Sequence, residues 1–118
     1  MDWISFDHPE QLNSIVQDSS VDDTVSVIFK HSTRCGISSM VKRGLEREWD
    51  LGANYKAYHL NLIRDRQISN LVEQEFSIRH ESPQVIVLKN GEVIHHASHS
   101  NIRVESIKKS VAQYLQTQ

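Results

Sequence analysis

The feature that most constrains the fold is a junction at the only cysteine of the chain, where one apolar pattern gives way to another. Val25 to Phe29 is a short run rich in β-branched and aromatic residues, which predicts a strand buried within a sheet. After Cys35 the apolar residues recur at spacings of three and four, which predicts a helix that runs to about Trp49. The residues that this spacing assigns to the core are Ile37, Met40, Val41, Leu45 and Trp49.

A strand that delivers a cysteine to the first turn of a helix gives the sulfur distinctive surroundings. Backbone N–H groups without partners and the positive end of the helix dipole both favour the thiolate over the thiol. Arg34 is adjacent to Cys35, and Lys30 and His31 are close in sequence, so these side chains could add positive charge. A lone cysteine is often only a small buried hydrophobe, but this position predicts a reactive thiol. His31 is a candidate catalytic partner only if it contacts the sulfur, which nearness in sequence does not guarantee.

The composition is that of one globular domain spanning residues 1–118. Apolar residues make up 38% of the chain and charged residues 24%, proportions that disfavour disorder. The formal net charge of -2 gives no reason to expect nucleic acid or an anionic membrane as a partner. No apolar run approaches the roughly 18 residues that a membrane span needs. We expect the protein to be a monomer.

The cysteine count and the first residues of the chain bear on the compartment. Met1 to Asp7 lacks the basic and apolar regions of a signal peptide. One cysteine cannot form an internal disulfide, which agrees with a reducing compartment. We therefore expect a cytoplasmic protein.

Apolar spacing and turn residues predict four helices and four strands. The predicted helices cover residues 8–18, 36–49, 64–76 and 101–115, and the predicted strands cover residues 25–29, 55–61, 84–89 and 92–97. Met1 to Asp7 is a lead-in segment that could form a short strand. Asn90-Gly91, between the last two strands, is typical of a type I′ hairpin turn. Further core positions are Ile68, Leu71, Val72 and Phe76 in the third helix, and Ile102, Ile107, Val111 and Leu115 in the last.

The order of these elements indicates the fold class. Strand–helix–strand connections in the first half imply parallel pairing, whereas the hairpin makes the last two strands antiparallel. We therefore predict an α/β fold with a four-stranded mixed sheet flanked by helices on both faces. The cysteine then opens the first crossover helix of that sheet.

Three motifs at matching separations resemble the thioredoxin family. They are Cys35-Gly-Ile-Ser38 after the apolar strand, Ser82-Pro83 before the third strand and Lys89-Asn-Gly-Glu92 at the hairpin. The resemblance implies a thioredoxin-like fold. In that family the proline is cis and lies beside the active-site cysteine, which implies that Pro83 faces Cys35 and that the Ser82 backbone pairs with an incoming substrate.

Two longer runs, His31 to Met40 and Glu81 to Gly91, resemble the YtxJ family, small thioredoxin-like proteins tied to bacillithiol metabolism and proposed as monothiol bacilliredoxins. The resemblance covers nearly the whole chain. It implies a thiol–disulfide oxidoreductase acting through Cys35, with bacillithiol as co-substrate and no tightly bound cofactor. Its partners would be proteins that carry mixed disulfides, together with the small thiol or a reductase. Family members commonly have proline after the active cysteine, and Gly36 in that place should loosen the helix start.

Ser38 stands where a dithiol enzyme carries its second cysteine, so an adduct on Cys35 must be cleared by another thiol molecule or by a reductase. Ser38 is expected either to hydrogen-bond the thiolate or merely to cap the helix or face solvent. Arg34 and Lys30 are expected to hold a carboxylate of the small thiol, because the co-substrate that the resemblance implies is acidic. The expected substrate contacts are Thr33, Arg34, Gly36, Ser82 and Pro83.

Three histidines near the end of the last strand raise the question of a metal site. His95 and His96 are adjacent and so point to opposite faces of a strand, which leaves only one of them able to share a site with His99. Two histidines alone make a weak metal site. We therefore predict that no metal is bound.

Two other functions remain open. Cys-Gly-Ile-Ser also resembles the Cys-Gly-Phe-Ser motif of monothiol glutaredoxins, some of which bind 2Fe–2S clusters with glutathione. Glutaredoxins hold glutathione with a Gly-Gly-x-Asp signature after the hairpin, where this chain has His95-His-Ala-Ser-His-Ser100. The alternatives to an oxidoreductase are therefore an iron–sulfur cluster carrier and a non-catalytic binding module on the same scaffold.

Overall fold

The computed structural model describes residues 1–52 and 54–117, and within these residues five strands form one sheet that four helices cover. The strands are β1 (Trp3–Ser5), β2 (Val25–His31), β3 (Tyr55–Asn61), β4 (Gln84–Lys89) and β5 (Glu92–Ser98). The helices are α1 (Gln11–Asp18), α2 (Gly36–Glu48), α3 (Arg66–Phe76) and α4 (Val104–Gln116), with a 3₁₀ turn η1 (His99–Asn101) before α4. None of these described helices is both long and apolar enough to cross a membrane.

The sheet is mixed, with the strand order β1-β3-β2-β4-β5. β1, β3 and β2 run parallel, whereas β4 is antiparallel to both β2 and β5. The hairpin between β4 and β5 has positive φ at Asn90 (54°) and at Gly91 (75°), as a type I′ turn requires. The predicted α/β class, the mixed sheet and the antiparallel last pair are confirmed.

The predicted number of strands is wrong, because the lead-in segment adds a fifth. Trp3 pairs with Ala57 of β3, and Phe6 just beyond the strand donates its N–H to the carbonyl of His59 at 2.9 Å. Three residues are too few to show the alternation of a strand, so the sequence pattern gives only a weak signal here. β1 lies at the edge of the sheet and places Trp3 on the side of the sheet that faces α2.

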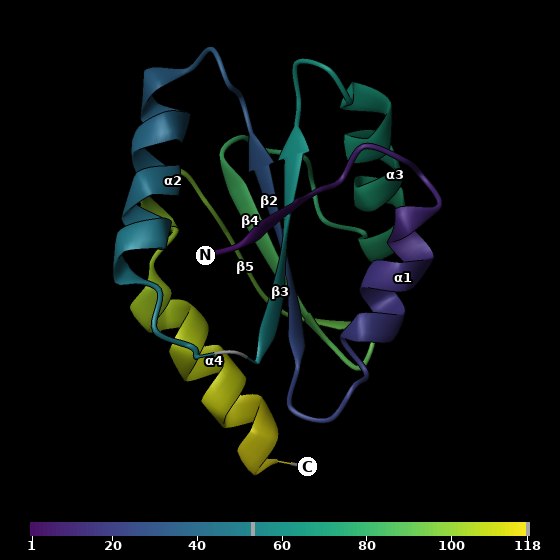
Figure 1. The fold of residues 1–118 in the computed structure, drawn as a ribbon, viewed down its shortest axis with the longest axis vertical. Helices are drawn as coiled ribbons and strands as arrows, with labels where there is room; N and C mark the ends of the chain where they lie inside the picture. Colours follow the sequence, from purple (N-terminus) through teal and green to yellow (C-terminus); the bar gives the residue numbers. More distant parts are fainter. Residues whose placement is uncertain (53, 118) are drawn as a thin grey trace.

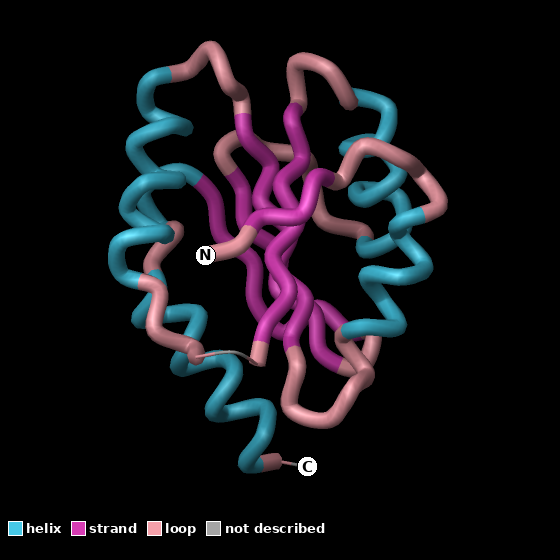
Figure 2. Tube along the Cα trace, viewed as in Figure 1, coloured by secondary structure: helices cyan, strands magenta, loops and turns pink. Residues whose placement is uncertain are grey.

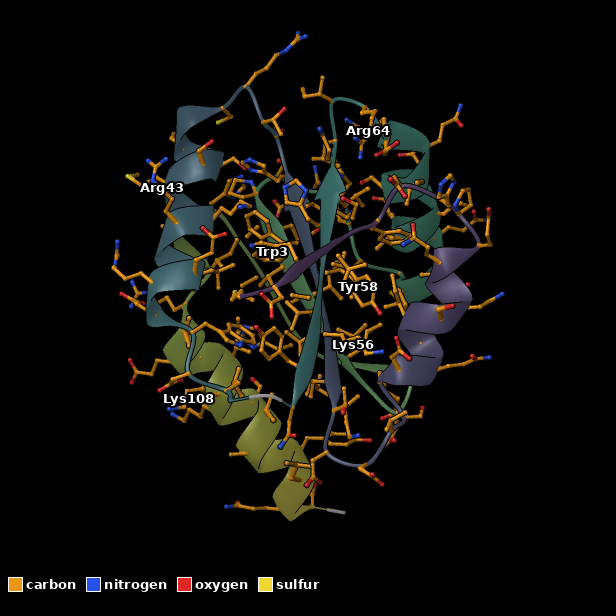
Figure 3. The ribbon with its side chains drawn as sticks, in the orientation of Figure 1. Trp3, Arg43, Lys56, Tyr58, Arg64 and Lys108 are labelled. Atoms are coloured by element: carbon orange, nitrogen blue, oxygen red, sulfur yellow. The ribbon has the colours of Figure 1, made fainter. Side chains whose placement is uncertain are left out.

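The helices lie in two layers with the sheet between them, α2 and α4 on one face and α1 and α3 on the other (Figures 1 and 2). Alternate residues of β2 divide between the two cores: Val27 and Phe29 pack toward α2 and α4, and Ile28 packs toward α1 and α3. On the second face, the Tyr58 hydroxyl of β3 donates to Asp18 of α1 at 2.7 Å (Figure 3). Both faces of the central strands are therefore buried.

Several element boundaries differ from the prediction. β2 continues to His31, because its last residues remain paired with β3. α1 begins at Gln11 and not at residue 8 as predicted. The side-chain oxygen of Gln11 accepts the backbone N–H groups of Asp7 and His8, which lie before the helix. α3 begins at Arg66 and α4 at Val104, each slightly later than the apolar spacing predicts.

Four predicted core residues are on the surface. Ile37 and Met40 of α2 are each 60% exposed, Leu115 of α4 is 40% exposed and Leu71 of α3 is 38% exposed. The buried face of α2 begins instead at Ser38, which is fully buried, and continues to Leu45. Ser38 thus shares the inward face of α2 with Val41, Leu45 and Trp49, and the first turn presents Ile37 and Met40 to solvent.

Candidate active site

Cys35 lies at the N-cap of α2, after a three-residue loop from the end of β2. Its N–H donates to the carbonyl of Ser32 at 3.0 Å, and its carbonyl accepts the first helical hydrogen bond, from Ser39 at 3.1 Å. The side chain is partly exposed and does not cap the helix. Cys35 therefore stands at the positive end of the dipole of α2.

Ser38 fastens the first turn of α2 to the end of β2. Its fully buried hydroxyl lies 2.7 Å from Nδ1 of His31 and accepts the N–H of Ser32 at 3.1 Å. Both hydrogen bonds of the hydroxyl thus go to the strand and its loop, and none joins it to the sulfur of Cys35 among the described residues. Ser38 orients the turn that carries the cysteine.

Two histidine rings lie together at the ends of β2 and β3. The ring centroids of His31 and His59 are 5.1 Å apart, and Phe29 stacks on His31 at 5.7 Å. Burial lowers the pKa of His31, and burial together with the neighbouring His31 lowers the pKa of His59 to about 4. Both imidazoles are therefore neutral at pH 7. Nε2 of His59 is buried without a hydrogen-bond partner in the described part of the chain.

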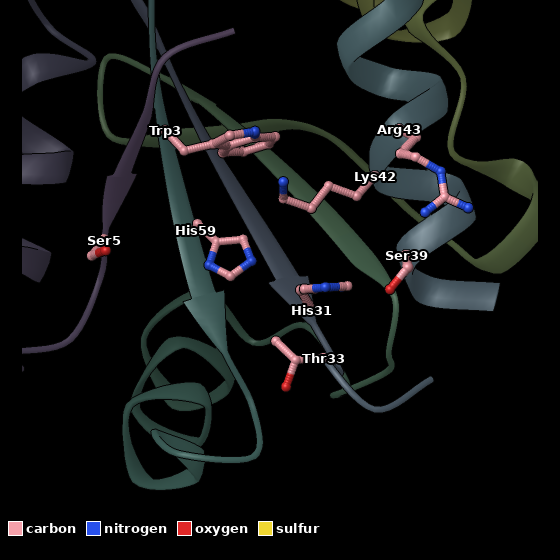
Figure 4. Close-up of a pocket in the computed structure, with 8 residues that line it drawn as sticks. All are labelled: Trp3, Ser5, His31, Thr33, Ser39, Lys42, Arg43 and His59. Atoms are coloured by element: carbon pink, nitrogen blue, oxygen red, sulfur yellow. The ribbon is translucent and has the colours of Figure 1, made fainter. Parts of the chain in front are cut away.

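A cavity of about 460 Å³ lies beside the cysteine loop, between the sheet and α2 (Figure 4). Trp3, His31 and His59 line it from the sheet, and Ser39, Lys42 and Arg43 line it from α2. Thr33, from the loop before Cys35, also lines it. His59 and the cavity have no signal in the sequence, whereas the alternation of β2 predicts that His31 shares a face with Phe29. His31, the candidate partner of the cysteine, pairs through Nδ1 with Ser38.

The two charged side chains that line the cavity, Lys42 and Arg43, differ in whether they form an ion pair. Lys42 pairs with Glu46 at 2.9 Å, and its ammonium lies 5.4 Å from the centroid of the Trp3 ring. The Trp3 indole also donates to Glu46, at 2.7 Å. Arg43 makes no ion pair with any residue in the described ranges. Arg43 is therefore the available positive charge at the cavity.

Lys30 does not lie where the sequence analysis expects it. It is fully buried on the α3 face of the sheet, opposite the face that carries His31, because adjacent strand residues point to opposite sides. Its ammonium lies 3.4 Å from Nδ1 of His80, and burial lowers its pKa to about 8 despite the nearby carboxylate of Glu73. The expectation that Lys30 holds a carboxylate of a ligand beside Cys35 is therefore wrong.

The other expected substrate contacts surround the cysteine loop. The Ser82 hydroxyl lies 2.9 Å from the hydroxyl of Ser32, which brings the segment before β4 against the loop that carries Cys35. The Ser82–Pro83 peptide bond is cis, and Pro83 is buried. Thr33, Arg34 and Gly36 are exposed. The structure thus gathers these five residues around one end of β2.

The three histidines near the end of β5 do not gather. Nδ1 of His95 lies 2.9 Å from the hydroxyl of Ser110 on α4, and burial lowers the pKa of its ring. His96 and His99 are exposed. Across residues 1–52 and 54–117, no three or more histidine, cysteine, aspartate or glutamate side chains form a group that could hold a metal ion.

Residues 4–107 match the family model described as monothiol bacilliredoxin BrxC. Among solved structures, a protein described as an oxidoreductase with a thioredoxin fold matches at 24% identity over 92% of each chain, with a TM-score of 0.73. A thioredoxin from Trypanosoma brucei brucei matches at 15% identity over 98% of this chain and 92% of that chain, also at 0.73. A thioredoxin from Nicotiana alata matches at 15% identity over 94% and 90%, at 0.68. The thioredoxin-like fold is therefore confirmed.

Proposed function

The chain belongs to the monothiol bacilliredoxin family, and from this premise we propose that it reduces mixed disulfides between proteins and bacillithiol through Cys35. Family and fold together support thiol redox chemistry as the general activity. The observation that carries the proposal is the place of Cys35. The only cysteine of the chain is partly exposed at the start of α2, and Ser38 occupies the position of a second thiol.

The first step is a thiol–disulfide exchange. The Cys35 thiolate attacks the bacillithiol sulfur of the mixed disulfide, so that one S–S bond breaks and a new one forms at Cys35. The substrate protein leaves as a thiolate, which takes a proton from water. The substrate cysteine is reduced, and Cys35 is oxidised to a mixed disulfide with bacillithiol.

The second step needs a thiol from outside the chain, because Cys35 is the only cysteine. A second bacillithiol thiolate attacks the adduct, which releases bacillithiol disulfide and restores the Cys35 thiolate. Over the two steps, the sulfur of the second bacillithiol is oxidised as it joins the first in a disulfide, and the substrate cysteine is reduced to its thiol form. Electrons therefore balance without a metal or a bound cofactor.

The residues around Cys35 hold the sulfur in place during both steps. Cys35 is the N-cap residue of α2, so the positive end of the helix dipole faces the residue whose sulfur gains and loses charge. The Ser38 hydroxyl pairs with Nδ1 of His31 and accepts the N–H of Ser32, and these two hydrogen bonds fix that turn against β2. The contact between Ser82 and Ser32 keeps the segment before β4 close to the approaching disulfide.

The test uses a peptide whose single cysteine carries bacillithiol, mixed with an equal amount of the reduced protein. Intact-mass spectrometry should show the protein gaining the mass of one bacillithiol while the peptide loses it, and added bacillithiol should then remove the adduct. Cys35→Ser should give no transfer. A wild-type protein that leaves the peptide modified over hours would overturn the proposal.

A further inference from the structure

We propose that the cavity beside the cysteine loop binds the carboxylate-bearing part of the small thiol while its sulfur is bonded to Cys35. Arg43 is the residue that receives the carboxylate. The inference rests on the proposed function and adds to it the place where the carboxylate of the small thiol is held and the residue that holds it.

The position of the cavity suits a ligand anchored at the cysteine. Thr33 and Ser39 line it, and they lie before and after Cys35 on the same short segment. Arg43 lies eight residues beyond Cys35 along α2, so at 1.5 Å per residue the two backbones are about 12 Å apart along the helix axis. A volume of about 460 Å³ is within the usual range of small-molecule sites.

The charge of the cavity favours an anion. Lys42 and Glu46 neutralise each other, and His31 and His59 are uncharged at pH 7 because burial lowers the pKa of each ring. Arg43 remains with no ion pair in the described part of the chain. A guanidinium presents paired N–H donors that match the geometry of a carboxylate.

A buried ring nitrogen and several hydroxyl and amino groups make the cavity suited to a hydroxylated ligand. Nε2 of His59 is buried and unpartnered among the described residues, and its ring lines the cavity. Figure 4 shows Lys42 extending from α2 toward Trp3 and His59, with the hydroxyls of Ser39 and Thr33 nearer the cysteine loop. An apolar ligand would leave Nε2 of His59 unpaired, whereas a hydroxyl of a small thiol can pair with it.

The experiment compares two peptides that differ only in the small thiol on their cysteine, one carrying bacillithiol and the other carrying 2-mercaptoethanol, which has no carboxylate. The quantity measured is the ratio of the two kcat/KM values for removal of the small thiol. Arg43→Gln removes the proposed carboxylate contact. Arg47→Gln is the matched control, since Arg47 lies on the same helix, is 72% exposed and is not in the cavity.

The wild-type protein should prefer the bacillithiol peptide, and Arg43→Gln should lower the ratio roughly tenfold, the effect of losing one charge-assisted hydrogen bond. Arg47→Gln should keep the wild-type ratio. An unchanged ratio in Arg43→Gln, or an equal loss of ratio in Arg47→Gln, would overturn the cavity as the binding site.

A second measurement does not depend on catalysis. The chain has two tryptophans, so Trp49→Phe leaves Trp3, which lines the cavity, as the only indole reporter. Bacillithiol disulfide and 2-hydroxyethyl disulfide each convert Cys35 to a mixed disulfide and release one thiol. The bacillithiol adduct should change Trp3 fluorescence and the mercaptoethanol adduct should not. Equal responses to the two adducts would contradict the proposal.

The outcomes for the two proposals are separate. A wild-type protein that clears both peptides with equal kcat/KM retains the oxidoreductase function and loses the cavity as a carboxylate site. A protein that clears neither peptide loses the proposed function. In that case the fluorescence of the two chemically formed adducts still decides whether the cavity recognises the anionic thiol.

Discussion

At the scale of single residues, Ser38 shows how a side chain beside a reactive group can act through the backbone. Its hydroxyl bridges His31 and the N–H of Ser32, and both partners lie on the segment that leads into Cys35. One buried oxygen thereby holds the end of β2 and the first turn of α2 in a fixed relative position. Ser38 is a positioning residue for the sulfur.

Ser38→Ala should destabilise the protein, because it leaves the Ser32 N–H and Nδ1 of His31 without their partner inside the structure. The expected loss in the free energy of unfolding is about 1–3 kcal/mol, measured by urea denaturation. Ser14→Ala, at an exposed position of α1, is the control and should change that free energy by less than about 0.5 kcal/mol. Equal stability of Ser38→Ala and wild type would show that the bridge contributes nothing.

At the scale of elements, α2 carries the cysteine but has two positions of low helix propensity, Gly36 and Gly44. A Cβ added at Gly44 would meet only the guanidinium of Arg47, at 3.9 Å, and one added at Gly36 would meet nothing within 4 Å. Neither glycine has the positive φ that would require this residue type. Packing therefore does not explain either glycine.

Gly44→Ala should raise the free energy of unfolding by about 0.5–1 kcal/mol, because alanine loses less backbone entropy in a helix interior. Urea denaturation of the variant and the wild type checks it. Gly91→Ala is the contrasting variant: its φ is +75° and an added Cβ would lie 3.4 Å from Cγ1 of Val16, so it should destabilise. A lower free energy of unfolding in Gly44→Ala than in the wild type would contradict this prediction.

Elements with strong local signals could be predicted from the sequence. β3 and β4 have the predicted bounds, because each is an apolar or alternating run that turn residues or proline delimit. β1 could not be predicted with the same force, since its three residues become a strand only by pairing with β3, distant in sequence. A short edge strand depends on tertiary context.

The candidate site was predictable in part. The junction at Cys35 follows from local pattern and the Ser82–Pro83 segment from the resemblance to the thioredoxin family, and the structure brings the two together through Ser32. The burial of Ser38 in place of Ile37 was not predictable from apolar spacing, because the contacts of the Ser38 hydroxyl with Nδ1 of His31 and the N–H of Ser32 are polar and leave no apolar pattern. Had the end of β2 been known, its alternation would have assigned Lys30 and His31 to opposite faces of the sheet.

At the scale of the whole molecule, four histidines that are buried or half-buried tie stability to pH in one direction. Burial is the main cause that lowers the pKa of His31, His59, His80 and His95. The folded state therefore binds fewer protons on these rings than the unfolded state does as pH falls below the usual histidine value of about 6.5. Acid thus favours unfolding.

The protein should be less stable at pH 5 than at pH 7. For His59, whose folded pKa is about 4, the loss begins as pH falls through about 6.5 and is complete near pH 4. This residue alone should account for about 1–2 kcal/mol between pH 7 and pH 5, measured by urea denaturation at both values. His59→Gln should reduce the difference, and His96→Gln, exposed on β5, should not. An equal difference in wild type and His59→Gln would contradict this origin.

The short edge strand β1 should open more readily than the other strands of the sheet. β1 is three residues long and pairs only with β3, so its amides should exchange with solvent sooner than those of the central strands. Trp3 lies on this strand, and opening of β1 would therefore remove one wall of the cavity beside the cysteine loop. A ligand in that cavity should therefore slow hydrogen exchange at the amides of β1. The exchange rate would then report binding even when no bond to the Cys35 sulfur forms.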